Sequence, residues 1–134
     1  MNPTPQVGYS KRSRLDKLGV KPDMRVAVLN VDDRWIMKEL NERTSDVATS
    51  RPKKDTDLIL FGVDGPKLLA RLATLRKSLK SNGMIWAIWP KGQQYIKEDM
   101  IRHAALKQDL VDVKVIAFSE TLSGLKLVVP LAKR

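Results

Sequence analysis

The sequence predicts an α/β fold with three layers around a mostly parallel sheet of five or six strands that ends in an antiparallel hairpin. Short apolar runs of strand length recur along the chain, and amphipathic helical stretches separate most of them. The last two runs are joined only by residues 120–123, and a connection that short produces an antiparallel pair. The longer helical connections return the chain for parallel pairing.

The first expected elements lie before residue 42. Ser10–Leu18 predicts a short helix that the following glycine ends, and Met24–Asn30 predicts a buried strand. A helix is expected over 33–41, with Asp32 or Asp33 accepting hydrogen bonds from its first amides. The apolar face of this helix would consist of Trp35, Ile36 and Leu40.

The next segment has a weaker pattern. Asp46–Ser50 is a candidate strand, but the link over 51–55 is too short for a crossover helix, so we expect an edge strand or none. A strong buried strand follows over 57–63. Because a poorly covered edge near 46–55 can pair with a second copy of the chain, a homodimer and a monomer both remain open.

The clearest helix is expected over 66–82, between Pro66 in its first turn and Gly83 past its end. Its buried stripe would consist of Leu68, Leu69, Leu72, Leu75 and Leu79. The opposite face is basic and holds no acidic residue. It consists of Lys67, Arg71, Arg76, Lys77 and Lys80.

The C-terminal part continues the alternation. An apolar strand is expected over 84–89, where Trp86 and Trp89 face opposite sides because they are an odd number of positions apart. A helix over 97–108 would bury Met100, Ile101, Ala104 and Ala105. The hairpin strands are expected over 112–119 and 124–130.

Composition limits the classes of function. The chain of 134 residues predicts one domain over 11–134, preceded by a flexible arm over 1–10. The absence of cysteine excludes disulfides and thiolate sites, and His103, the only histidine, is expected as a plain helix residue, so no metal site is expected. Without a signal peptide or a membrane-length apolar run, we expect a cytoplasmic protein with no membrane partner.

The element order resembles the Rossmann-like fold of the class I S-adenosylmethionine-dependent methyltransferases. Their seven-stranded sheet also ends in an antiparallel hairpin, and they enter the first strand through a segment like Leu18-Gly19-Val20-Lys21-Pro22-Asp23-Met24-Arg25-Val26. The chain also resembles a small bacterial family on that scaffold, which implies a fold and no activity. The segments that carry this second resemblance are Tyr9-Ser10, Leu18–Pro22, Met24–Asn30, Trp86 with Trp89-Pro90-Lys91, Val111–Val115 and Ser119–Lys126.

The turn after the first strand departs from that family. The resemblance implies an acidic residue and then a Gly-x-Gly-x-Gly turn, and aligned on Arg25-Val26 the acidic place is Val28. The three glycine places hold Asn30, Asp32 and Arg34. Asn30 can adopt a left-handed conformation, but the other two carry side chains where the backbone should approach a cofactor.

The positions of the acidic residues also differ from those that the resemblance implies for cofactor binding. Asp32 and Asp33 would repel a carboxylate or phosphate at the helix N-terminus. The ribose-binding acid implied after the second strand has no counterpart in 47–50. Asp64 is the only matching carboxylate, and a turn before Gly65-Pro66 also explains it.

The sequence therefore predicts a non-enzymatic binding or interaction module on a degenerate methyltransferase-like scaffold, without a cofactor. Ligands of such sheets sit beyond the carboxyl ends of the strands. Trp89 and Lys91 could stack on and neutralise a planar anion there, or else Trp89 caps the core and Lys91 is solvated. The first alternative is a minimal S-adenosylmethionine-dependent methyltransferase with an atypical pocket. The candidate rim consists of Asn30, Asp32, Arg34, Asp64, Trp89 and Lys91, with Glu120 beside them.

The net charge gives a second alternative. The chain has 25 Lys and Arg against 15 Asp and Glu, a net charge of +10, which favours polyanions. The basic face of helix 66–82 could bind nucleic acid without sequence preference if a second cluster lies on the same side; otherwise the charge is a solvated surface. The second cluster consists of Lys11, Arg12, Arg14 and Lys17.

Overall fold

A six-stranded sheet forms the centre of the protein. The structure, a computed structural model, describes residues 13–134, so the arm expected over 1–10 lies outside it. The strand order is β2-β1-β3-β4-β6-β5; β2, β1, β3 and β4 are parallel, and β6 runs antiparallel to both β4 and β5. This confirms the mostly parallel sheet with a C-terminal hairpin. The strands are β1 (Arg25–Leu29), β2 (Asp46–Ala48), β3 (Thr56–Gly62), β4 (Leu79–Pro90), β5 (Val111–Ala117) and β6 (Leu122–Val128).

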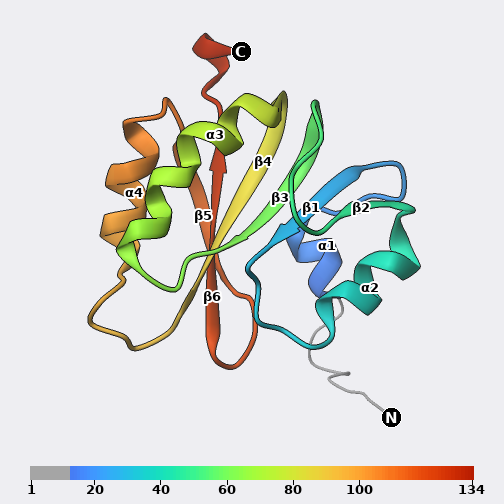
Figure 1. Ribbon diagram of the computed structural model, residues 1–134, viewed down its shortest axis with the longest axis horizontal. Coiled ribbons are helices and arrows are strands. Elements are labelled where there is room, and N and C mark those ends of the chain that lie inside the picture. The colour runs from blue at the N-terminus through green and yellow to red at the C-terminus, as the bar shows by residue number, and fades with distance from the viewer. Residues whose placement is uncertain (1–12) are drawn as a thin grey trace.

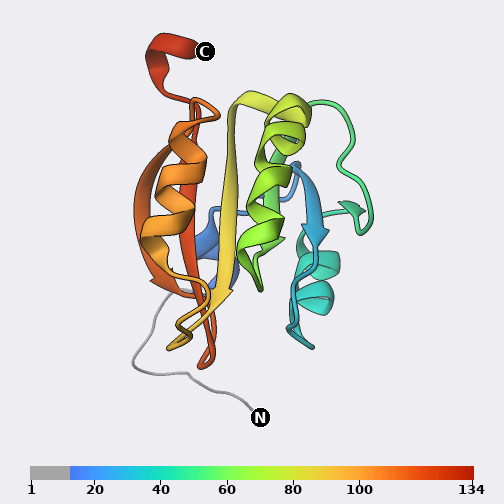
Figure 2. The ribbon, with the colours of Figure 1, turned by 60° about the vertical axis from the view of Figure 1, so that its left-hand side comes forward.

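Helices cover both faces of the sheet, which gives the three predicted layers (Figures 1 and 2). One face is packed by α1 (Arg14–Leu18) and α2 (Ile36–Arg43). The other is packed by the 3₁₀ helix η1, by α3, which continues it, and by α4. No helix within residues 13–134 is long and apolar enough to cross a membrane. The remaining helices are η1 (Pro66–Arg71), α3 (Leu72–Ser78), α4 (Glu98–Leu106) and a C-terminal 3₁₀ turn, η2 (Leu131–Lys133).

The two tryptophans of β4 lie in different cores, as their odd spacing predicts. Trp86 is fully buried with Leu15 and Leu18 of α1, and its indole Nε1–H donates to the Leu18 carbonyl at 2.9 Å. Trp89 is buried on the opposite face, in the core that α3 and α4 cover. Trp86 therefore connects the centre of the sheet to the end of α1.

The weak strand predicted at 46–50 exists as the three-residue edge strand β2. It pairs only with Arg25–Ala27, the first part of β1. The chain consequently leaves β2 near the amino end of β3, and the link over 49–55 reaches that end without a helix. An edge this short offers few free backbone groups for pairing, and dimerisation through it stays a prediction.

The prediction of a helix over 66–82 is wrong for the last four residues. Helix α3 ends at Ser78, and residues 79–82 already belong to β4, where Leu79 pairs with Thr56 of β3. Gly83 lies inside the strand, close to β3: a Cβ there would stand 2.8 Å from the Asp57 carbonyl oxygen. Pairing with β3 therefore overrides the helical leucine spacing, and Lys80 leaves the helix.

Two side chains predicted to be buried are exposed. Helix α2 begins only at Ile36, so Trp35 lies before its buried stripe and is 56% exposed. Met100 of α4 is 38% exposed, while Ile101 and Ala105 of the same helix are buried as predicted.

Replacing Trp86 by Phe should lower the free energy of unfolding by about 2 kcal/mol, because it removes a buried hydrogen bond and leaves a cavity. Trp35→Phe is the matched control. Since Trp35 is mostly exposed, its replacement should change the stability by less than about 0.5 kcal/mol. Urea unfolding followed by circular dichroism measures both, and equal effects would contradict the burial of Trp86.

Candidate functional site

The carboxyl ends of the parallel strands form the rim where this kind of sheet binds ligands. The turn after β1 begins at Asn30, whose φ of 56° is left-handed, as its place in the turn predicts. The Asn30 side-chain Nδ2 donates to the Gly62 carbonyl at the end of β3, at 3.0 Å. A Cβ at Gly62 would stand 1.7 Å from the Asn30 carbonyl oxygen, so only glycine fits there. The turn is packed directly against the neighbouring strand.

Two backbone amides at the start of α2 are bonded within the protein. The Oδ1 of Asp33 accepts hydrogen bonds from the backbone N–H of Trp35 and of Ile36, each at 3.0 Å. This confirms the predicted cap and assigns it to Asp33 rather than Asp32. A helix N-terminus binds anions through such amides, and here a carboxylate of the chain already accepts from two of them.

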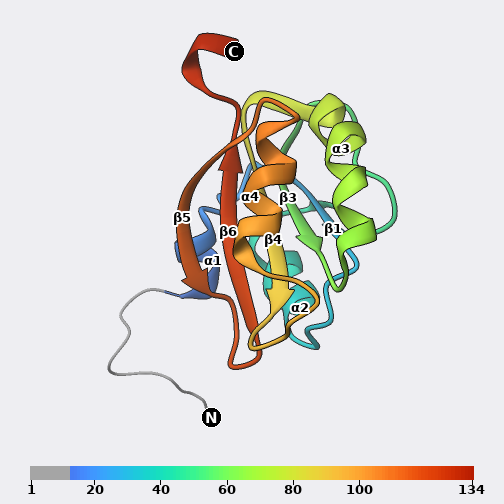
Figure 3. The same ribbon diagram turned by 90° about the vertical axis from the view of Figure 1, so that its left-hand side faces the viewer.

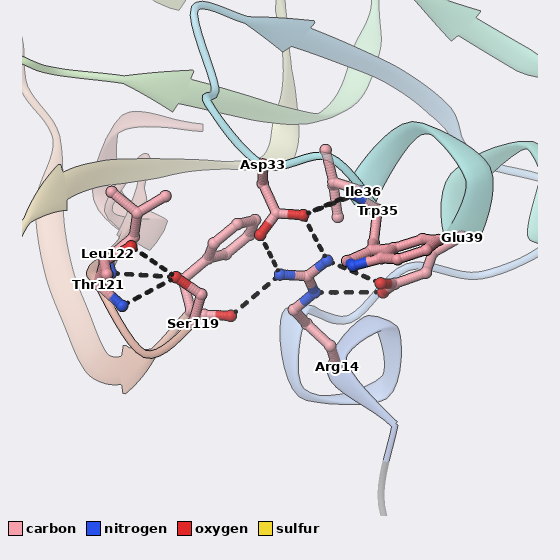
Figure 4. Close-up of polar contacts among 9 residues, drawn as sticks. Arg14, Asp33, Trp35, Ile36, Glu39, Ser119, Thr121 and Leu122 are labelled. Carbon is pink, nitrogen blue, oxygen red and sulfur yellow. Dashed lines mark hydrogen bonds and ion pairs between the residues drawn. The ribbon is translucent and has the colours of Figure 1, made fainter. Parts of the chain in front are cut away.

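Arg14 holds that carboxylate in place (Figure 4). Its guanidinium donates two hydrogen bonds to Asp33, at 2.7 and 3.0 Å, and two to Glu39, at 3.1 and 2.7 Å. A fifth bond reaches the Phe118 carbonyl at 3.2 Å, and the guanidinium lies 4.6 Å from the centre of the Phe118 ring. Arg14 therefore links α1, the turn before α2 and the loop after β5.

Burial opposes the charged state of both partners, yet the network keeps them ionised. Burial alone would raise the pKa of Asp33, but the hydrogen bonds and charge of Arg14, with the amides of Trp35 and Ile36, lower it below its usual value. Burial alone would lower the pKa of Arg14, but Asp33 and Glu39 raise it. The side chains of Arg14 and Asp33 are only 18% and 10% exposed, so water screens this pair weakly.

Two hollows flank residues 30–32 on the rim. The one toward β3 and β4 has a volume of about 160 Å³ and combines apolar side chains with Asn30, Asp32 and Asp64. The one toward β2 has about 280 Å³ and is open, and it includes Thr49 after that strand. Pockets for cofactor-sized ligands start at roughly 300 Å³. Each hollow therefore suits a smaller group.

The structure brings only part of the predicted rim together. Asn30, Asp32 and Asp64 share the smaller hollow. Trp89 is 7% exposed in the core, which agrees with the reading that it caps the core, and Lys91 is exposed with its backbone N–H bonded to the Thr121 carbonyl. Arg34 lies instead over the ring of the exposed Trp35, 5.0 Å from its centre. Glu120 is exposed in the hairpin loop.

The predicted basic face is smaller than the sequence indicates. Lys67, Arg71 and Lys77 are exposed on η1 and α3, whereas Arg76 is half-buried and its Nε has no hydrogen-bond partner within residues 13–134. Lys80 stands on β4 and forms an ion pair with Asp57 at 3.2 Å.

The two basic clusters do not combine. Arg14 and Lys17 lie on α1, which covers the face of the sheet opposite to η1 and α3 (Figure 3). Arg14 is also bonded to Asp33 and Glu39, and Lys11 and Arg12 lie outside the described residues. The polyanion hypothesis requires both basic clusters to lie on one side and to follow the same phosphate backbone. Arg14 and Lys17 do not meet this condition.

Metal ligation finds no support in the part of the chain that the structure describes. No group of three or more His, Asp or Glu side chains with a metal-binding arrangement occurs in residues 13–134. His103 is exposed on α4, as a plain helix residue should be.

Two residues that shape the rim were missed from the sequence. Arg14 looked like one member of a basic cluster, and nothing in its neighbours signals partners as far away as Asp33 and Phe118. Gly62 did carry a signal: a glycine at the end of a buried strand often marks the close approach of another backbone.

Comparison with known proteins agrees with the fold. No protein-family model matches the sequence, and no curated protein matches it significantly. A SAM-dependent methyltransferase of Aquifex aeolicus is 14% identical over 87% of each chain, with a TM-score of 0.60. The ribosomal protein L11 methylase of Lactobacillus delbrueckii subsp. bulgaricus is 16% identical over 85% of this chain and 73% of its own, with a TM-score of 0.56. The chain has a methyltransferase-like, Rossmann-like fold; identities this low show the fold alone.

Gly62→Ala should destabilise the protein by about 3 kcal/mol or more, since its methyl group would overlap the Asn30 carbonyl. Gly65→Ala is the matched control, because its φ of −173° suits any residue and no atom lies within 4 Å of an added Cβ. Thermal unfolding of both variants provides the comparison. A Gly62→Ala protein as stable as the control would show that the turn does not pack on β3.

Asp33→Asn should lower the free energy of unfolding at pH 7 by about 2 kcal/mol, through loss of the charged hydrogen bonds to Arg14. Because the folded pKa of Asp33 is lowered, its contribution is complete above the unfolded pKa of about 3.9 and disappears as the pH falls further. The difference from wild type should therefore shrink below that pH.

Urea titrations across this pH range measure the effect. Asp23 is an exposed carboxylate at the other end of β1, so Asp23→Asn is the control. Its free energy of unfolding should equal that of wild type throughout the pH range. If the difference in the free energy of unfolding between wild type and Asp33→Asn stays constant with pH, the ionised pair is not its origin.

Proposed function

We propose that the protein is a non-catalytic binding module on a methyltransferase-like fold. The observation that carries the proposal is the closed turn after β1. Asp33 accepts from the amides of Trp35 and Ile36 at the start of α2, and the Asn30 side chain donates to the Gly62 carbonyl. A cofactor that needs these backbone groups would have to break both arrangements, together with the ion pair to Arg14.

The size and charge of the rim support the same conclusion. The hollow beside the turn holds about 160 Å³, and two of its polar side chains are the carboxylates Asp32 and Asp64. A ligand that presents a carboxylate there would be repelled by both. Small neutral or cationic groups fit this hollow better than S-adenosylmethionine does.

An exposed aromatic residue follows the turn after β1 and offers a surface for a binding partner. Trp35 is 56% exposed at the start of α2, with the guanidinium of Arg34 over its ring. Tryptophan and arginine are the side chains most enriched among residues that dominate protein interfaces. This pair supports a role in binding a partner rather than in holding a cofactor.

A second candidate is a minimal S-adenosylmethionine-dependent methyltransferase. The structural neighbours favour it, since they include a SAM-dependent methyltransferase and a ribosomal protein L11 methylase. On this chain the reaction would need Asp32 and Asp64 to hold the cofactor's amine and hydroxyl groups, and the two hollows to merge around residues 30–32.

Calorimetric titration with S-adenosylmethionine and S-adenosylhomocysteine distinguishes the two functions. For a non-catalytic module we expect no binding tighter than about 1 mM, because Asp33 already accepts from the amides of Trp35 and Ile36. A micromolar or tighter dissociation constant would overturn the proposal and favour the methyltransferase.

Carboxylate variants then locate any binding that is observed. Asp64→Ala should abolish binding if the cofactor occupies the rim, whereas Asp23→Ala, an exposed carboxylate at the opposite end of the sheet, should leave it unchanged. Equal loss in both would indicate nonspecific association rather than a site.

A further inference from the structure

The outer surface of the helices on one face contains a groove away from the rim. Helix α4 packs beside η1 on the same face of the sheet, and Figures 2 and 3 show α4 running alongside the η1–α3 helix. The hollow between η1 and α4 has a volume of about 330 Å³. Its main lining residues are Leu69, Ala70, Met100, His103, Ala104 and Lys107.

Part of the groove's lining is apolar. Leu69 and Ala104 are partly buried against the core below, and Ala70 is an exposed small residue beside them. Met100 is 38% exposed at the edge of the hollow, although the sequence pattern predicts it to be buried. A flexible thioether at such a position can adapt to an incoming apolar side chain.

Basic side chains lie on both sides of the groove's apolar residues in the sequence. Lys107, just after α4, lines the groove, and Lys67 and Arg71 are exposed on η1, where the Arg71 guanidinium lies 5.9 Å from the centre of the Phe61 ring. Within residues 13–134 no carboxylate forms an ion pair with any of the three. The acidic residues at the start of α4, Glu98 and Asp99, are both paired with Arg102.

We propose that this groove binds an acidic peptide segment that carries a pair of large apolar side chains. The apolar lining residues would take the apolar pair, and Lys107, with Lys67 on η1, would contact the carboxylates on either side. Nucleic acid fits less well, because the described lining contains no Phe, Tyr or Trp on which bases could stack. The groove goes beyond the function proposed above, since it does not depend on whether the rim takes a cofactor.

The test uses a fluorescein-labelled peptide of alternating glutamate and serine with one Leu-x-x-Phe pair at its centre. Fluorescence anisotropy should show saturable binding by the whole protein at low salt. Met100→Ser and Lys107→Glu should each weaken it about fivefold or more, since each removes one of the two kinds of contact.

Matched variants separate the groove from general charge. Leu106→Ser removes an exposed apolar side chain from α4 outside the groove, and Lys54→Glu makes the same charge change on the 49–55 link. Both should leave the affinity within about twofold of wild type. Thermal unfolding of all four variants confirms that each is folded.

Four outcomes would overturn the proposal. They are absence of binding at low salt, equal affinity for a peptide whose Leu and Phe are replaced by Ser, equal weakening by Lys54→Glu and Lys107→Glu, and tighter binding of single-stranded RNA than of the peptide. The last outcome would instead support the polyanion hypothesis. None of these results depends on the titration with S-adenosylmethionine, so either proposal can fail alone.

Discussion

The guanidinium of Arg14 joins three parts of the chain that are distant in sequence: α1, the turn and helix around Asp33 and Glu39, and the loop at Phe118. Helix α1 has five residues, too few to be stable alone, so its position depends on tertiary contacts. Those contacts are the burial of Leu15 and Leu18, the indole hydrogen bond from Trp86, and the Arg14 network. One half-buried cation thus connects an otherwise marginal helix to the starting point of α2.

That network also determines the chemistry of the rim. By pairing with the charge of the ionised Asp33, Arg14 allows a carboxylate to remain largely buried against the amides of Trp35 and Ile36, at the end of α2 that favours anions. On the other side of the turn, Asn30 is bonded to Gly62. The protein therefore combines the sheet and helices of a methyltransferase-like fold with a first turn that its own side chains close. The function proposed above depends on this turn, because a shared fold does not by itself give a shared function.

The charge of the protein is organised differently on the two faces. On the side of α1 and α2, arginines serve the structure: Arg14 binds Asp33 and Glu39, and Arg43 binds Asp16 and the Val20 carbonyl. On the other face, Lys67, Arg71 and Lys107 are exposed, and none of them forms an ion pair within residues 13–134. The net charge of +10 is therefore a poor guide to function on its own, because it does not say which cations are paired within the structure and which are exposed.

The sequence alone determined the features that depend on local periodicity. Alternating apolar runs defined the strands, odd spacing placed Trp86 and Trp89 on opposite faces, and the short last connection required a hairpin. Local backbone chemistry also identified the left-handed conformation of Asn30 and a carboxylate cap on the following helix.

Tertiary structure decided the features that depend on partners far along the chain. Helical spacing continues past Ser78, but pairing of Leu79 with Thr56 converts those residues into strand. The role of Arg14 and the separation of the two basic clusters follow from which elements pack together. The physical reason is that periodicity reports which side of an element is apolar, whereas ion pairs, close backbone approaches and clefts require the position of a second element.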